Sequence, residues 1–100
     1  MLKAKAEIVF TLEGRNYSGK NVLRPAFNFG EDLLFSGQIK GDTDKYLYNQ
    51  EYDVDIDFFT IEGEAYEAVQ PLLKVDMDLA IQEGSRIIGL AKLVDFAYEQ

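Results

Sequence analysis

The feature that most constrains the fold is a pair of apolar runs that meet at Gly84-Ser85, within residues 79–89. A glycine-containing dipeptide between two apolar runs is typical of a β-hairpin with a two-residue turn. Glu83 and Arg86 flank this dipeptide, so the hairpin would place opposite charges across its mouth. The pattern predicts paired antiparallel strands near the end of the sequence.

Strict alternation between acidic and apolar side chains predicts a half-buried strand at residues 53–58, and a similar alternation recurs at residues 75–81. Gly37 marks a bulge or a close approach within a further strand. The remaining strands are expected at residues 4–12, 26–29, 33–40 and 87–96. Six short strands separated by turn signals predict an all-β fold, either a small antiparallel barrel or a sandwich.

The rest of the sequence predicts loops and a little helix. Residues 13–25 and 41–53 are polar and carry turn-forming or charged side chains, so we expect loops there. Residues 62–70 contain no helix breaker after Gly63, so one or two helical turns are expected, which Pro71 would end. The apolar side chains expected to share one face of that helix are Ala65, Ala68 and Val69.

Composition bounds the class of protein. The 100 residues, 47% of them hydrophobic, suffice for one domain with a modest core. Cysteine and histidine are absent from the sequence, which excludes disulfides, thiolate or histidine metal sites and catalysis by a histidine base. The first residues lack a signal-peptide core, and no uncharged run approaches the length of a membrane span. We therefore expect a cytoplasmic protein that does not enter a membrane.

The net charge is −8, from ten Lys and Arg against eighteen Asp and Glu. Non-specific binding to nucleic acid depends on Lys and Arg contacts with phosphates, so this balance opposes it. A cationic protein partner is electrostatically favoured instead.

Two stretches approach known ligand-binding loops without meeting their chemistry. Residues 14–21 resemble a phosphate-binding loop, but Asn21 replaces the hydroxyl that holds magnesium, and Pro25 follows where a helix is needed. Residues 42–53 begin like a calcium loop, but Leu47 occupies the position that requires glycine. We expect ordinary loops here, with no nucleotide, metal or other cofactor bound.

Carboxylates recur on two of the expected strands. Asp53, Asp55 and Asp57 share one face of a strand, and Asp76 and Asp78 share one face of another. If the two strands are neighbours, the five carboxylates form one acidic face. That face is either a docking surface for a basic partner, a weak site for a divalent cation, or a solubilising surface that blocks edge-to-edge aggregation. Nothing marks one acid as buried in a pocket, so we expect no enzyme activity.

The cationic side chains gather mainly in the first expected loop. Arg15, Lys20 and Arg24 lie there close to Tyr17, and Arg86 would join them if the hairpin folds against the loop. A nucleic-acid surface combines cations and aromatics in this way. The alternative is structural, with the arginines bonding backbone carbonyls and Glu83.

Several of these stretches occur together in the order found in one family. A Gly14-Arg15 pair follows the first strand, residues 24–29 read Arg-Pro-Ala-Phe-Asn-Phe, residues 36–39 read Ser-Gly-Gln-Ile, and the hairpin at residues 79–89 comes last. From about residue 5 to residue 96, the chain resembles the third, C-terminal β-barrel domain of elongation factor Tu and related translational GTPases. The resemblance implies a six-stranded antiparallel β-barrel.

In that family the barrel contacts the T stem of aminoacyl-tRNA, packs on the GTPase domain and second barrel, and contributes to exchange-factor binding. By resemblance, Arg24, Glu83 and Gly84 match positions near the RNA. The full set of candidate RNA contacts is Arg15, Lys20, Arg24, Glu83, Gly84 and Arg86.

Three departures from the family pattern change RNA-facing positions, and two of them remove positive charge. Ala26 replaces a glutamine, Gln82 replaces an arginine, and residues 30–32 (Gly-Glu-Asp) replace a basic turn. The chain also contains no GTPase domain and no second barrel, so it is either a piece of a larger protein or a free-standing domain. We therefore expect a non-catalytic cytosolic binding or adaptor module that engages a protein partner. The alternatives are a tRNA-binding module and a mimic that competes for a toxin or exchange factor.

Overall fold

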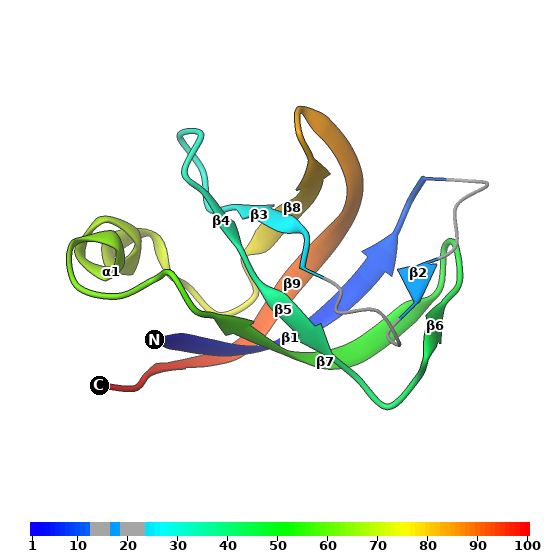
Figure 1. Cartoon of the computed structure of the whole chain (residues 1–100), viewed down its shortest axis with the longest axis horizontal. Coiled ribbons are helices and arrows are strands. Elements are labelled where there is room, and N and C mark those ends of the chain that lie inside the picture. The colour runs from blue at the N-terminus through cyan, green and yellow to red at the C-terminus, as the bar shows by residue number, and fades with distance from the viewer. Residues whose placement is uncertain (13–16, 19–23) are drawn as a thin grey trace.

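The computed structural model describes residues 1–12, 17–18 and 24–100, and most of its elements are antiparallel β-strands. Figure 1 shows a strongly curled sheet with a short helix at one end. The strands in these ranges are β1 (Leu2–Phe10), β2 (Tyr17–Ser18), β3 (Ala26–Asn28), β4 (Leu34–Ser36), β5 (Gln38–Lys40), β6 (Lys45–Tyr46), β7 (Glu51–Phe58), β8 (Asp78–Glu83) and β9 (Arg86–Tyr98). The helical elements are α1 (Glu64–Val69) and the 3-10 turn η1 (Gln70–Leu72).

Seven of the described strands form one sheet in the order β4-β3-β8-β9-β1-β7-β5, with every pair antiparallel. The short strands β2 and β6 pair separately. The two edge strands, β4 and β5, are consecutive in the chain and separated only by Gly37. The sheet therefore curls until its two edges meet in one continuous segment, which gives a barrel-like shape (Figure 1).

Gly37 lies where this segment passes from one edge of the sheet to the other. Its backbone N–H donates to the carbonyl of Pro25 at 3.1 Å, next to the pairing of β4 with β3. A Cβ atom added there would lie 2.7 Å from Cγ2 of Ile56, 2.8 Å from Cε1 of Phe58 and 3.0 Å from Cε2 of Phe27. The predicted close approach at Gly37 is confirmed, because these core side chains leave no room for a methyl group.

The core lies on the inner face of the curled sheet. Along β1 the buried side chains alternate with outward-facing ones, as a half-buried strand requires. The ring of Phe58 packs edge-to-face against Phe27 and Phe29, with 5.2 Å between ring centroids in each pair. This aromatic cluster contacts Gly37 and joins β3 to β7 across the interior.

The β8–β9 hairpin predicted from the sequence is confirmed. Glu83 pairs with Arg86 across a two-residue turn, and Gly84 has a φ of 59°, which glycine adopts without steric cost. Register shifts leave one extra residue in β9 at two places, Ile88 and Val94. Such bulges increase the local twist and allow this 13-residue strand to follow the curl of the sheet.

The strand count is higher than the six expected, since nine strands occur in the described part of the chain. The stretch at residues 33–40 is divided into β4 and β5 at Gly37. The stretches expected to be loops at residues 13–25 and 41–53 contain β2 and β6. These two strands pair because Tyr17 and Tyr46 are both anchored in the core.

The helical turns expected at residues 62–70 are present, since α1 ends at Val69, before Pro71 as expected, and the 3-10 turn η1 continues the chain to Leu72. Pro71 lies at the start of η1, where the missing N–H of proline breaks no hydrogen bond. Of the residues expected to share a buried face, Val69 is buried whereas Ala68 is exposed. No helix within residues 1–12, 17–18 and 24–100 has the length and apolar character needed to cross a membrane.

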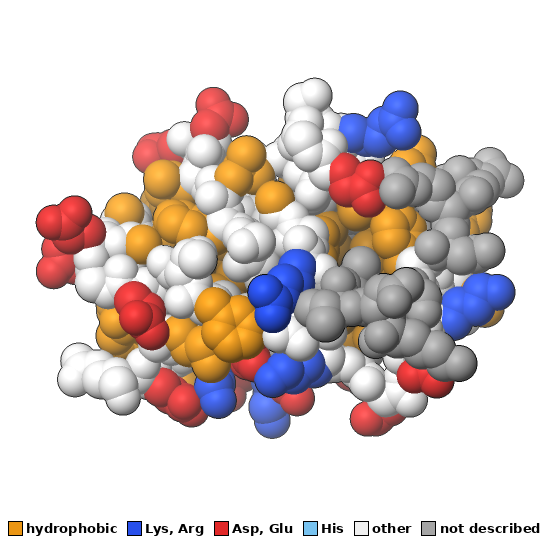
Figure 2. All heavy atoms as spheres, in the orientation of Figure 1, with side chains coloured by type: hydrophobic (Ala, Val, Ile, Leu, Met, Phe, Trp, Pro, Cys, Tyr) orange, Lys and Arg blue, Asp and Glu red, His pale blue; other side chains and the backbone are white. Residues whose placement is uncertain are grey.

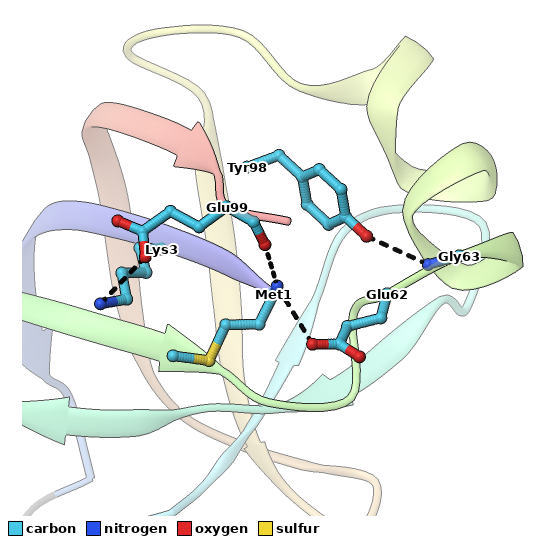
Figure 3. Close-up of polar contacts among 6 residues, drawn as sticks. All are labelled: Met1, Lys3, Glu62, Gly63, Tyr98 and Glu99. Atoms are coloured by element: carbon cyan, nitrogen blue, oxygen red, sulfur yellow. Dashed lines mark hydrogen bonds and ion pairs between the residues drawn. The ribbon is translucent and has the colours of Figure 1, made fainter.

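The end of β9 holds the start of β1 and the start of α1 in place. Met1 and Glu99 exchange hydrogen bonds of 2.5 and 3.0 Å, and the N–H of Gly63 donates to the hydroxyl of Tyr98 at 3.2 Å (Figure 3). The ring of Tyr98 stacks on Tyr66 of α1 at 3.8 Å between centroids. These contacts dock the helix against the sheet.

We predict that Gly37→Ala lowers the free energy of unfolding by roughly 1–3 kcal/mol, as overpacked core positions do. The added methyl group would overlap side chains of the aromatic cluster. Urea denaturation measures the change, with Ser36→Ala on the exposed position before it as the matched control. Equal stability of the two variants would contradict the close contact at Gly37.

Candidate functional site

The five carboxylates expected to form one acidic face lie in two separate places. Strands β9 and β1 stand between β8 and β7, the strand that carries Asp53, Asp55 and Asp57. Asp78 is the first residue of β8, whereas Asp76 lies in the preceding turn with a φ of 71°. The single acidic face is therefore wrong, and so is the strand face shared by Asp76 and Asp78. The strand order that separates these residues is set by long-range pairing.

On the outward side of the sheet, β1 places basic side chains between acidic ones. Its register sets Lys3 opposite Asp57 and Lys5 opposite Asp55. We use the term outer face for the side of β8, β9, β1 and β7 that points away from the core. Figure 2 shows lysine and carboxylate side chains intermingled along the lower edge of the view. Part of the outer face is thus a mixed-charge surface in which cross-strand pairs of opposite charge support the sheet.

A hollow of about 360 Å³ opens over this mixed-charge surface. Its walls already contain ion pairs, because Lys3 lies 3.3 Å from a carboxylate oxygen of Glu99 and Lys40 pairs with Asp57. Asp57 is only 6% exposed, so its pairing with Lys40 compensates a charge removed from water. The charged residues among those that line the hollow are Lys3, Lys5, Lys40, Asp55, Asp57, Asp95 and Glu99. Since these positive and negative charges largely cancel, the hollow attracts neither a cationic nor an anionic ligand in particular.

Beside the mixed-charge surface, β9 exposes a line of aliphatic side chains. Ile87, Leu90 and Val94 are 54%, 42% and 44% exposed. Val9 of β1 lies directly opposite Leu90 and is half-buried. We call these four residues the apolar strip. A single exposed aliphatic side chain is ordinary, but several along one strand are typical of an interaction surface.

A smaller hollow, of about 110 Å³, lies beside the centre of the apolar strip. The described residues that line it are Glu7, Ile8, Val9, Glu51, Asp78, Leu90 and Lys92. The set comprises three carboxylates, one lysine and three aliphatic residues, of which Val9 and Leu90 belong to the apolar strip. The site thus combines an apolar centre with a charged rim.

The sequence pattern at residues 87–96 predicts a strand but does not reveal the apolar strip. A signal was present in the adjacent pair Ile87-Ile88, since neighbouring side chains of a strand point to opposite faces. In the structure Ile88 is buried and Ile87 is exposed. The sequence pattern does not predict the bulge at Val94.

The candidate RNA contacts are brought together only in part. Arg15 and Lys20 lie outside the described residues. Ala26 pairs with Gln82, so β3, which Arg24 and Pro25 directly precede, lies next to β8, which leads into the β8–β9 turn. The guanidinium of Arg24 lies 5.4 Å from the ring centroid of Phe59, a cation–π contact.

The turn of the hairpin carries the other candidates. Glu83, Gly84 and Arg86 are all exposed there, at the end of β8 and the start of β9. The hairpin therefore presents one acid and one base to solvent next to the strand that follows Arg24.

The stretch at residues 42–53 forms a second small acidic region rather than a ligand cage. Burial raises the pKa of the Tyr46 hydroxyl above its ordinary value of 10.0, and the charge of Asp42 raises it further. Within the described ranges, no group of three or more His, Cys, Asp or Glu side chains is placed to hold a metal ion. Asp42 and Asp44 are exposed in the connection between β5 and β6, and Glu51 and Asp53 are exposed on β7.

In comparisons with known proteins, neither a family model nor a curated protein sequence matched the chain. The resemblance to the third domain of elongation factor Tu therefore remains a prediction. Since a fold alone does not define a function, the outer face and the hairpin are the features from which a function is inferred.

We predict that Lys40→Met destabilises the fold by roughly 1–3 kcal/mol, because it removes the ammonium group that forms an ion pair with the buried carboxylate of Asp57. The double variant Lys40→Met/Asp57→Asn should recover most of this loss. Thermal or urea unfolding provides the measurement, and Lys45→Met, at an exposed lysine of β6, controls for the loss of one positive charge. An unchanged stability in Lys40→Met would show that Asp57 does not depend on the pair.

Proposed function

We propose that the chain is a non-catalytic binding module that engages a protein partner through the outer face of its sheet. The observation that carries this proposal is the apolar strip, whose centre at Val9 and Leu90 lies beside a row of charged side chains and ends at Glu51. Protein–protein interfaces have this anatomy, with an apolar centre that is desolvated and a polar rim that remains wet.

The module is proposed to work in the cytosol and to share the barrel of the third domain of elongation factor Tu. The order of its motifs supports this assignment, as does the curled antiparallel sheet. Further support comes from the pairing of β3 with β8, which places the Arg24-Pro25 motif beside the Glu83-Gly84 turn, the two elements with the most specific resemblance. A sequence free of cysteine fits a reducing compartment.

The chemistry of the available side chains supports a role without catalysis. The sequence has no histidine or cysteine to serve as a base or nucleophile. Asp57, which is buried, is paired with Lys40 rather than presented to a substrate. On the outer face, Asp55 and Asp57 lie opposite Lys5 and Lys3 of β1.

We predict that Leu90→Asp abolishes binding of the protein partner while leaving the fold intact, because it places a charge in the centre of the apolar strip. The measurement is affinity purification with the wild-type chain as bait, followed by repetition with the variant. Val75→Asp is the matched control, since Val75 is 56% exposed in the turn before β8 and lies outside the strip. Recovery of the same partner by Leu90→Asp would refute the proposed surface.

A second candidate function is binding of tRNA, and the pairing of β3 with β8 favours it by joining the Arg24 motif to the hairpin. If tRNA binds there, a gel shift should weaken at higher salt and weaken further in Arg24→Glu, since phosphate contacts depend on positive charge. Lys45→Glu, with the same change in charge on β6, is the control. Absence of a shift at low salt would end this candidate.

A further inference from the structure

We propose that the segment of the partner that seats on the outer face is a short basic stretch carrying an aliphatic anchor, which enters the hollow beside Leu90. This inference rests on the proposed function, because it specifies the chemistry of the partner that the module binds. It follows from the strand register, the charges and the size of that hollow.

The strand register arranges the side chains around the hollow in two parallel rows across the sheet. One row runs Ala80, Leu90, Val9 and Glu51 from β8 to β7. The next row runs Asp78, Lys92, Glu7 and Asp53 over the same strands. An aliphatic row therefore lies beside a charged one, and both face solvent.

The charge of this region is negative. Lys92 stands directly between Asp78 and Glu7 in the register, so it is already matched by two carboxylates. Glu51 and Asp53, which end the two rows on β7, are exposed and face no lysine of β1 in the register. A partner with Lys or Arg on either side of its anchor would meet these carboxylates, which favours association and sets its orientation.

The size of the hollow points to a side chain of a protein. At about 110 Å³ it lies well below the roughly 300–1,000 Å³ of sites that bind a small-molecule ligand. An aliphatic side chain would cover Val9 and Leu90 and remove their exposed apolar surface from water.

A second copy of the chain is the less favourable occupant. Each copy carries a net charge of −8, and the acidic ends of the two rows would face like charges. A basic segment instead gains from both the apolar strip and the acidic side chains.

The inference is tested with a short synthetic peptide that alternates lysine and leucine. We expect saturable binding to the wild-type protein by fluorescence anisotropy. Binding should weaken by about tenfold or more when glutamate replaces lysine or serine replaces leucine, and it should weaken as salt rises from about 0.05 M to about 0.5 M. Equal binding of the lysine and glutamate peptides, or of the leucine and serine peptides, would overturn the inference.

Protein variants locate the binding. The double variant Glu51→Lys/Asp53→Lys should lower the affinity for the lysine–leucine peptide by about tenfold or more, since it reverses the charge at the β7 end of both rows. Glu64→Lys/Glu67→Lys on the exposed face of α1 makes the same change in net charge and should have a much smaller effect. Equal weakening by the two variants would show attraction by net charge alone and would overturn the inference.

The two proposals fail in different ways. If the natural partner is lost in Leu90→Asp but kept in Glu51→Lys/Asp53→Lys, the outer face remains the binding surface and the basic segment is overturned. If the lysine–leucine peptide binds as expected but no natural partner depends on Leu90, the inference that the outer face accepts a basic segment with an aliphatic anchor is supported. The proposed function, binding of a natural protein partner through this face, is then refuted. Sedimentation of the wild-type chain as a concentration-dependent dimer, abolished by Leu90→Asp, would assign the surface to a second copy and overturn the basic segment.

Discussion

The contact of Gly37 with the aromatic cluster is the constraint on which the rest of the structure depends. One short segment supplies both edges of the seven-stranded sheet found in the described residues, and it does so at a position where no Cβ fits. If the segment stood further from Phe27 and Phe58, β4 and β5 would no longer reach β3 and β7 together. The curl of the sheet, and with it the enclosure of the core, follows from that approach.

The curl determines what the outer face presents. Because the inner side of β1, β7, β8 and β9 is filled by apolar side chains, the charged half of each alternating pattern is turned to solvent. The bulge at Val94 changes that alternation and leaves an aliphatic side chain exposed between charged neighbours. The exposure of Val94 is therefore a consequence of bending one long strand around the core, whereas Val9 and Leu90 occupy ordinary outward positions of the sheet. The strip lies beside a surface whose charges are mainly acidic at the β7 ends of the two rows.

Local patterns in the sequence predicted local structure well and long-range structure poorly. The hairpin at Gly84-Ser85, the half-buried strand at residues 53–58 and the close approach at Gly37 were all readable, because each depends on a turn, a two-residue period or a missing side chain. The separation of Asp78 from Asp53 could not be predicted from the sequence, since strand order depends on pairing between distant segments. The turn at Asp76 was also missed, because a left-handed aspartate interrupts an alternation that otherwise continues into β8.

The central proposal is that the binding surface is the outer face and not the end of the sheet that carries the hairpin. Mapping of backbone amide chemical shifts, as the lysine–leucine peptide is added to the isotope-labelled protein, tests it most directly. We predict saturable shifts concentrated at residues 7–9, 51–53, 78–80 and 90–92. Shifts concentrated at residues 24–26 and 82–86, or shifts spread evenly over the acidic surface, would contradict this proposal.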